Sequence, residues 1–336
     1  MSAGRYSRQE LFAGVGGIGQ EKLSRAKVAV VGLGALGTVA ADSLCRAGVG
    51  FLRLVDRDCV ELSNLQRQTL FTEEDAREER PKAVAAARRL AAVNSAVTAE
   101  PLVADVNAGN IGRVLAGVDL ALDGSDNFET RYLLNEACHS LGLPWIYAGA
   151  LGGEGGTMNI LPGGPCFRCL APAVPAPGSY PTCGTAGALN MVTGIVALYQ
   201  AAEAVKILLG SPETSRSYLS VDIWRGTERR ALIRRNPDCP VCGRGEYEFL
   251  TRRRDAGGVS LCGQEAVQIV PGAPAELDLP ALAAELRRLG AVKLTPFMLS
   301  FEGPVSFRLF PDGRAVIQNV TTTAAAKSVY AEYIGL

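Results

Sequence analysis

Apolar and polar positions along the chain form alternating strand-like and helix-like segments from about residue 27 onwards. The run "KVAVVG" is apolar, rich in valine and ends in glycine, which is typical of a parallel strand buried on both faces. The alternation predicts an α/β fold with a Rossmann-like, doubly wound, mostly parallel sheet. The expected helices are 35–47, 82–93, 109–116 and 127–141, and the expected strands are 51–56, 97–103, 118–123 and 144–150.

The pattern changes in the second half of the chain. Residues 152–182 are rich in glycine and proline, which indicates loops, here around one strand at 156–161. A long apolar segment follows at about 185–209. Because its second half contains Gln200, Glu203 and Lys206, we expect a buried core helix rather than a membrane span. Strands are expected again within 217–224 and 228–235.

A shift of composition near 244–258 indicates a boundary between two domains. We expect a large α/β domain at 1–245, a linker at 246–258 and a small α+β domain at 259–336. The small domain should contain a strand at 266–270, a helix at 278–290, a hairpin at 305–319 with Asp-Gly at its turn, and a last helix at 322–333.

Composition removes several classes of function. Lys and Arg together number 34 and so do Asp and Glu, so no net charge favours nucleic acid or an anionic membrane as a partner. The N-terminus shows no secretory pattern, and we expect a cytoplasmic protein. His139 is the single histidine, which argues against serine-hydrolase triads and histidine-rich metal sites. Chemistry is therefore expected from carboxylates, cations, thiols or a metal.

The stretch "VVGLGALG" points to a nucleotide. Gly32, Gly34 and Gly37 have the G-x-G-x-x-G spacing between a strand and a helix, where backbone N–H groups can bind a phosphate. Asp56 follows at the end of the next strand, which suits the ribose hydroxyls. The motif does not name the nucleotide: NAD is one interpretation, and a tight turn without any ligand is another.

Polar residues that follow two strand ends favour a triphosphate. Cations beyond the glycine loop suit a charge that must be neutralised during reaction, and carboxylates suit Mg²⁺. Scattered surface charge would explain any one of these residues alone, but all of them follow strand ends of one expected sheet. They are Asp58, Asn64, Arg67, Gln68 and Lys82 after the second strand, and Asp123, Asp126 and Asn127 after the fourth.

Two C-x-x-C pairs predict a metal site in a zinc-knuckle region. Cys166 and Cys169 form one pair, and Cys239 and Cys242 form the other. Four thiolates without an open position are typical of structural zinc, so the expected role is to clamp loops together. A redox pair or an iron–sulfur cluster would use the same residues.

The other cysteines divide into inert residues and one possible nucleophile. Cys45, Cys138 and Cys262 are expected to be inert, and Cys59 is either a core residue or part of the site lining. Cys183, in "PTCGTAG", lies on a Pro/Gly turn before the long helix, where a helix N-terminus lowers a thiol pKa. Its residues alone leave a structural and a nucleophilic role equally open.

Together these motifs resemble those of the ubiquitin-activating-enzyme-like adenylyltransferases, the ThiF/MoeB/HesA family. The resemblance covers about 1–245 and rests on "RYSRQ", "GLGALG", "LVDRDCVELSNLQRQ", "RPKA", "DGSDNFETR" and the two cysteine pairs. It implies an enzyme that adenylates the C-terminal Gly-Gly carboxylate of a small ubiquitin-like sulfur carrier with ATP and Mg²⁺ and releases pyrophosphate. It also implies a homodimer, and it suggests a cysteine desulfurase as a further candidate partner.

The resemblance assigns roles to individual residues. It gives Gly34 and its neighbours to the phosphates and Asp56 to the ribose. Asn64, Arg67 and Lys82 would then hold the triphosphate and Asp126 would hold Mg²⁺. Arg8 is similar to an arginine that reaches the neighbouring subunit's site. Cys183 stands in a context like that of the thiazole (ThiF) branch, in which it would act in sulfur transfer to a ThiS-like carrier.

Other functions fit part of the same residues. Within this chemistry the alternatives are a molybdopterin-synthase (MoaD-like) carrier or a carrier of another pathway. From other classes come an NAD-dependent oxidoreductase and a nucleotide-binding scaffold without activity. The small C-terminal domain is expected either to stabilise the enzyme or to dock the carrier.

Overall fold

The computed structural model divides the chain into two compact units, Met1–Arg252 and Arg253–Leu336. The division falls inside the expected linker. Within that linker, α11 (Glu248–Thr251) packs against α7 (Phe128–Leu141), so this part of it belongs to the first unit. The described residues are 4–175, 186–252, 258–260, 266–271 and 277–335.

The first unit is built on an eight-stranded sheet with the order β3-β2-β1-β4-β5-β6-β7-β8. Neighbouring strands from β3 to β5 pair in parallel, and β6, β7 and β8 extend the sheet in antiparallel fashion. The predicted doubly wound, mostly parallel sheet is thereby confirmed. Its strands are β1 (Lys27–Val31), β2 (Phe51–Asp56), β3 (Thr98–Val103), β4 (Leu120–Asp123), β5 (Trp145–Leu151), β6 (Glu154–Ile160), β7 (Tyr218–Asp222) and β8 (Thr227–Ala231).

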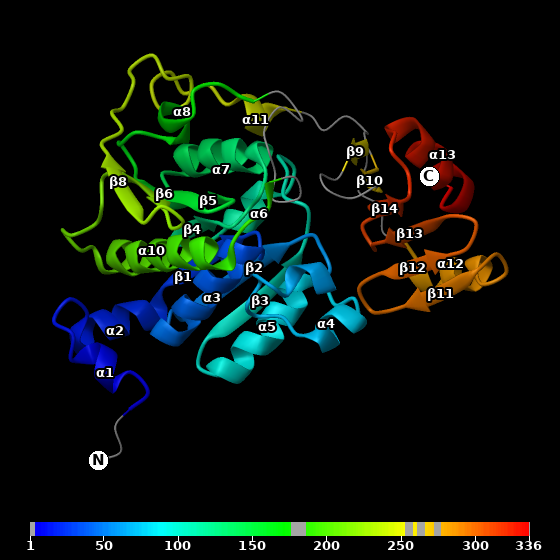
Figure 1. Cartoon of the computed structure of the whole chain (residues 1–336), viewed down its shortest axis with the longest axis horizontal. Coiled ribbons are helices and arrows are strands. Elements are labelled where there is room, and N and C mark those ends of the chain that lie inside the picture. Colours follow the sequence, from blue (N-terminus) through cyan, green and yellow to red (C-terminus); the bar gives the residue numbers. More distant parts are fainter. Residues whose placement is uncertain (1–3, 176–185, 253–257, 261–265, 272–276, 336) are drawn as a thin grey trace. The chain divides into compact units, whose positions relative to one another are not determined.

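Helices cover both faces of this sheet, as Figure 1 shows. In β1, Val28 and Val30 face a core shared with α3, α5 and α10, whereas Ala29 and Val31 face a core shared with α6, α7 and the cysteine knuckles. A strand buried on both sides needs such a continuous apolar run. The helices of this unit are α1 (Ser7–Glu10), α2 (Gly16–Arg25), α3 (Ala35–Ala47), η1 (Leu62–Asn64), α4 (Glu73–Arg77), α5 (Lys82–Val93), α6 (Ile111–Leu115), α7, α8 (Phe167–Leu170), α10 (Asn190–Leu209) and α11.

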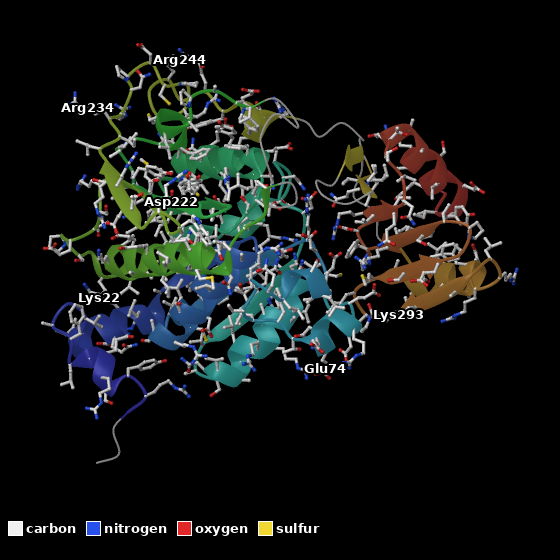
Figure 2. The ribbon with its side chains drawn as sticks, viewed as in Figure 1. Lys22, Glu74, Asp222, Arg234, Arg244 and Lys293 are labelled. Atoms are coloured by element: carbon white, nitrogen blue, oxygen red, sulfur yellow. The ribbon has the colours of Figure 1, made fainter. Side chains whose placement is uncertain are left out.

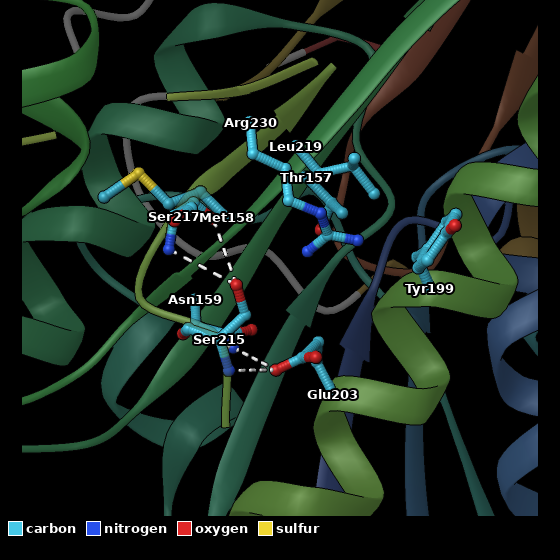
Figure 3. Close-up of a pocket in the computed structure, with 9 residues that line it drawn as sticks. All are labelled: Thr157, Met158, Asn159, Tyr199, Glu203, Ser215, Ser217, Leu219 and Arg230. Atoms are coloured by element: carbon cyan, nitrogen blue, oxygen red, sulfur yellow. Dashed lines mark hydrogen bonds between the residues drawn. The ribbon is translucent and has the colours of Figure 1, made fainter. Parts of the chain in front are cut away.

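Helix α10 is long and apolar enough to span a membrane by length and composition. In the structure it packs on α3, β5 and β6, and its polar residues have partners inside the unit. Gln200 Nε2 donates to the carbonyls of Asp123 and Ile146, each at 2.9 Å. Glu203 accepts from Asn159 and from the Ser215 amide, as Figure 3 shows. The prediction of a core helix is confirmed, although one of its faces stays uncovered.

The second unit is an antiparallel sheet with two helices and its own apolar core. The strand order is β11-β12-β13-β14-β10-β9, and α12 and α13 pack against it. The expected hairpin is β13–β14. The elements are β9 (Gly258–Ser260), β10 (Ala266–Ile269), α12 (Leu279–Leu286), β11 (Ala291–Leu294), β12 (Leu299–Glu302), β13 (Ser306–Leu309), β14 (Ala315–Gln318) and α13 (Thr323–Tyr333).

Short or half-exposed elements differ most from the sequence-based expectations. The predictions did not include α1, α2 or α4, nor the strands β9, β11 and β12. Helix α12 ends at Leu286 rather than at 290, because the chain turns there into β11. The residues of β11 are mostly exposed, so they show no apolar alternation that would indicate a strand.

Candidate active site and metal centre

The glycine motif forms a close backbone contact at the ends of β1 and β4. Gly32 has φ +91°, a conformation that favours glycine. A Cβ atom on Gly37 would lie 1.9 Å from the Gly32 carbonyl oxygen, and one on Gly124 would lie 2.4 Å from that same atom. Glycine is therefore required at all three positions. The loop leaves its backbone open to a ligand at the point where the strand order reverses, between β1 and β4.

Helix α3 presents an N-terminus that suits an anion. Its N-cap is Gly34, which offers no side chain to the first N–H groups, and its first turn contains no acidic residue. Free N–H groups and the helix dipole attract negative charge at such an end. The loop and this helix thus have a geometry that suits a phosphate, and their role in binding one stays a prediction.

Asp56 ends β2 beside this loop and is 9% exposed. Its carboxylate accepts from the Leu33 amide at 2.7 Å and from the Asp58 amide at 2.8 Å. Burial raises the pKa of Asp56, and the Lys82 ammonium opposes that rise. Each carboxylate oxygen retains a further lone pair. Asp56 can therefore hold the glycine loop and still accept a ribose hydroxyl.

Lys82 is the first residue of α5 and is only 7% exposed. Its Nζ lies 3.4 Å from Asp58 Oδ2, and the Lys82 amide donates to the Asp58 carbonyl at 2.9 Å. Burial would lower the pKa of Lys82, but the carboxylates of Asp58, Asp56 and Asp126 outweigh it and raise the pKa. The ammonium is charged at neutral pH. A cation at a helix N-terminus opposes the dipole, and a bound anion relieves that conflict.

Arg57 is a partly buried cation of this site that the sequence did not predict. Its guanidinium lies 3.1 Å from Asp105 and 3.6 Å from Asp58. Burial disfavours the charge, but the surrounding carboxylates of Asp105, Asp58, Asp126 and Asp56 raise the pKa of Arg57. Its position between two aspartates, in "DRD", is the feature of the sequence that could have indicated it.

The cofactor-binding roles expected for Asn64, Arg67 and Gln68, in the segment after Asp58, stay predictions. Asn64 is buried and forms a reciprocal capping box with Glu61 around η1. Arg67 is partly exposed, and its Nη1 donates to the Ser63 carbonyl at 3.0 Å. The Gln68 Oε1 is buried and has no hydrogen-bond partner among the described residues. The segment is ordered by its own contacts, and Gln68 offers an unused acceptor.

The two aspartates of "DGSDN" have different surroundings. Asp123 is fully buried, accepts from the amide and hydroxyl of Ser125, and pairs with Arg131 Nε at 3.1 Å. Burial raises the pKa of Asp123, and Arg131 opposes this. Asp126 is exposed and acts electrostatically on Lys82, Arg57 and Arg131. Asp123 thus braces the loop, whereas the Asp126 carboxylate is accessible to a cation.

Asn127 has a structural role in the described residues. It is the N-cap of α7, and its Oδ1 accepts from the Thr130 amide at 2.8 Å. This bond fixes where the helix begins, two residues after Asp126. A direct role of Asn127 with the cofactor stays a prediction.

Arg8 lies far from the glycine loop of its own chain. It is exposed on α1, which is anchored through Tyr6 to Asn94 at 2.8 Å and through Gln9 to the Ala47 carbonyl at 2.9 Å. Ala47 ends α3, whereas the glycine loop is at its start, roughly 20 Å away for a helix of this length. Within one chain Arg8 therefore cannot complete the site.

The four predicted metal ligands come together on the α7 side of the sheet. The Sγ atoms of Cys166 and Cys239 are 3.6 Å apart, those of Cys169 and Cys242 are 3.4 Å apart, and all four lie within 4.8 Å of one another. A zinc tetrahedron with Zn–S bonds of about 2.3 Å has S···S edges of roughly 3.8 Å. These distances exceed a disulfide bond of about 2.05 Å. The donor set fits one tetrahedral metal ion.

The cysteines outside this cluster are core residues where the structure describes them. Cys45 and Cys138 are fully buried and Cys59 is nearly so. Burial raises the pKa of Cys45 to about 11, so its thiol is inert at neutral pH. Cys183 and Cys262 lie outside the described residues. Downstream of Cys183, the Gly187 carbonyl and the Leu189 amide bond to Gly152, just past the end of β5.

Comparison with known proteins decides the family. The ThiF family model matches residues 6–241. The chain belongs to the ThiF family. It is 43% identical over 337 residues, 99% of both chains, to the sulfur carrier protein ThiS adenylyltransferase of Bacillus subtilis. It is 41% identical over 242 residues to the Escherichia coli protein of the same name, which covers 71% of this chain and 94% of that one.

A solved structure supports the fold. The crystal structure of Escherichia coli MccB with MccA-N7isoASN has a TM-score of 0.65 and 24% identity, covering 72% of this chain and 75% of that one. The resemblance to the ThiF family that the motifs indicated is thus confirmed. The B. subtilis relative matches throughout, whereas the E. coli relative matches a length close to that of the first unit. The second unit is therefore not shared by all ThiF family members.

Proposed function

We propose that this protein is an ATP- and Mg²⁺-dependent adenylyltransferase of a ThiS-like sulfur carrier. The observation that carries the proposal is the ammonium of the buried Lys82, which Asp58 and Asp56 keep charged beside a glycine loop that opens a helix. It occurs in a chain that matches a ThiS adenylyltransferase along 99% of its length. A cytoplasmic location follows from the proposed pathway, and a cysteine desulfurase is the proposed supplier of sulfur.

The reaction requires positioning and charge stabilisation more than proton transfer. A carboxylate oxygen of the carrier's terminal glycine forms a bond to the α-phosphorus, and the bond from that phosphorus to the bridging oxygen of the leaving pyrophosphate breaks. The nucleophile is already ionised, so no base is needed. The single histidine, His139, lies near the C-terminal end of α7, where its ring contacts the Tyr247 hydroxyl. Lys82 and Arg57 supply fixed positive charge where negative charge develops.

Two metal ions complete the proposal. The Asp126 carboxylate would hold Mg²⁺ against the phosphates, where the ion neutralises charge. Zinc is the proposed ion of the four-cysteine cluster, in a structural role, because four thiolates leave no open position. The cluster joins the segment after β6 to the segment after β8 and so clamps this side of the unit.

The decisive test is ATP–pyrophosphate exchange with purified carriers. We expect exchange of labelled pyrophosphate into ATP only when a carrier ending in Gly-Gly is present. Of two carriers, one ThiS-like and one MoaD-like, the ThiS-like one should become adenylated, as detected by mass spectrometry. Exchange without a carrier, or with neither carrier, would contradict the proposal. NAD binding without ATP binding would favour an oxidoreductase instead.

Replacing Cys183 with serine should separate activation from sulfur transfer. If the thiol acts on the activated carrier, Cys183→Ser keeps carrier-dependent exchange and loses formation of the carrier thiocarboxylate. Exchange is followed as label in ATP and the thiocarboxylate by mass spectrometry of the carrier, with Cys45→Ser as a thiol control remote from the proposed chemistry. Unchanged thiocarboxylate formation in the Cys183 variant would leave this residue a structural role only.

A homodimer is the proposed assembly, and α10 supports it. Its uncovered face carries an apolar stripe of Met191, Ile195 and Leu198, which are 62%, 39% and 54% exposed. These residues recur at i, i+4 and i+7, so they lie on one side of the helix. Exposed apolar side chains gathered in this way are typical of a protein interface. The remote position of Arg8 in its own chain supports its predicted role in the partner's site.

Mixing two inactive variants should restore activity. We expect Arg8→Ala and Lys82→Met to be inactive alone, because each removes one cation from every site. In a heterodimer one site regains both residues, so random mixing should restore about a quarter of the wild-type rate. Exchange activity after co-refolding measures this. A mixture that stays inactive although mass spectrometry shows heterodimers would refute the shared site.

A further inference from the structure

One cation outside the nucleotide site has no role in the proposed chemistry. Residues 155–202 contain a single charged side chain, Arg168, in the first cysteine knuckle. The nearest acidic residues along the chain are Glu154 and Glu203. Glu154 is engaged by Arg225, and Glu203 by Lys206 and Asn159. No acidic residue close in the sequence therefore pairs with Arg168 in the described part of the chain, and its role must be inferred from its contacts in the fold.

The Arg168 guanidinium is partly buried and incompletely satisfied. Its Nε and Nη1 atoms are buried and have no hydrogen-bond partner among the described residues. The group lies over the ring of Tyr132, with its central carbon 5.1 Å from the ring centroid. The Tyr132 hydroxyl in turn donates to the carbonyls of Ala171 and Ala173, at 3.1 and 2.9 Å. Tyr132 therefore fixes the guanidinium and the chain that follows it.

We propose that Arg168 binds main-chain carbonyl oxygens of the carrier's extended C-terminal tail. This inference rests on the proposed function and adds a tail-binding residue to it. Buried donors without acceptors are unfavourable in a folded protein, so their persistence points to a ligand that supplies acceptors. A guanidinium offers a planar fork of N–H groups that suits such oxygens.

The position of Arg168 fits a tail that ends at the nucleotide site. Tyr132 follows the N-cap Asn127 by five residues, so it lies about 8 Å along α7 from the loop that carries Asp126. With the Tyr132 side chain and the 5.1 Å from its ring to Arg168 added, the guanidinium lies within roughly six extended residues of that loop. A tail whose terminal carboxylate reaches the α-phosphate would place the preceding peptide groups near Arg168.

The chemistry of the tail also fits this residue. A Gly-Gly sequence has no side chains, so a protein recognises it through its backbone groups. The uncharged segment around Arg168 offers no competing carboxylate, and the described part of the Gly-Pro-rich region 155–175 carries no other charge. A phosphate is the less suitable ligand for Arg168. The proposed phosphate site already has its own cations beside the glycine loop, Arg57 and Lys82, which come from elements after β2.

The kinetic test separates carrier binding from nucleotide binding. In Arg168→Met we expect the KM for the ThiS-like carrier to rise about tenfold, because a charged hydrogen bond is lost, while the KM for ATP stays within twofold. Arg234→Met is the matched control: Arg234 is exposed, as Figure 2 shows, and both constants should stay unchanged. Arg168→Lys keeps the charge but lacks the planar guanidinium, so its KM for the carrier should fall between those of the wild type and Arg168→Met.

Two further measurements distinguish a structural role. The metal content and Tm of Arg168→Met should match those of the wild type, because the proposed role concerns the ligand. If Arg168→Met does not fold, Arg168→Lys carries the test. An unchanged carrier KM, or a rise of the ATP KM in parallel, would refute the tail contact. A wild-type protein without carrier-dependent exchange would instead refute the proposed function, which makes the two failures distinguishable.

Discussion

Replacing Lys82 with methionine should lower carrier-dependent ATP–pyrophosphate exchange by roughly 100- to 1,000-fold, the usual effect of removing one charge-stabilising donor. Methionine keeps the length and the apolar stem and removes only the ammonium group. Lys82 is 7% exposed and its pKa is raised by Asp58, Asp56 and Asp126, so its charge is fixed at neutral pH. The wild-type reaction therefore uses this cation at every pH suited to the assay.

The same substitution should also raise the pKa of the neighbouring Asp56 carboxylate. Lys82 lowers the pKa of Asp56 against the effect of burial. Without the ammonium that pKa rises further, so the folded state binds the Asp56 proton more tightly than the unfolded state does, and the variant loses stability as the pH rises through that range. Lys22→Met is the control, since Lys22 lies on the surface in α2, away from the site (Figure 2). Exchange within threefold of the wild-type rate in Lys82→Met would contradict the proposed role.

Replacing Cys239 with serine should remove the metal and destabilise the first unit. Cys239 and Cys166 are a buried cross-motif pair, so the variant loses one of four ligands in a closed site. Structural zinc contributes several kcal/mol or more to folding, and each kcal/mol shifts Tm by about 2–4 °C in a domain of this size. We expect a fall in Tm of at least about 10 °C.

Metal content gives the sharper readout. Elemental analysis should find about one zinc per wild-type chain, as a single tetrahedral Cys₄ site requires, and little in Cys239→Ser. Cys138→Ala is the matched control: Cys138 is a buried thiol outside the cluster, and its loss should leave the metal in place. Iron in place of zinc, or a Cys239→Ser variant that keeps both its metal and its Tm, would refute structural zinc.

The parts of the site that depend on local spacing could be predicted from the sequence. Gly32, Gly34 and Gly37 stand between a strand and a helix, and their spacing alone defines a turn with close backbone approach. The two C-x-x-C pairs likewise indicate a four-thiolate site, although Cys166 and Cys239 are far apart along the chain. Buried strands such as "KVAVVG" show long apolar runs, so the order of the central elements was readable as well.

Other predictions failed or stayed open because burial depends on packing between distant segments. Asp123 and Asp126 look equivalent in "DGSDN", yet Asp123 is buried against Arg131 and only Asp126 is exposed. Arg57 was missed because its partner Asp105 comes from the segment after β3. Strands β11 and β12 were missed because strands of four residues leave little periodicity, and the residues of β11 are also mostly exposed.

The sequence by itself determined that this protein has a glycine-rich loop between a strand and a helix, two C-x-x-C pairs that can supply four thiolates, and the motifs of the ThiF family. These features rest on residue types at fixed spacing, which need no knowledge of the fold. Only the tertiary structure decided which charges are buried, which ones pair, and that Arg168 keeps two donors without a partner among the described residues. Solvation and electrostatic energies depend on what surrounds a group in space, and that is settled only when the chain has packed.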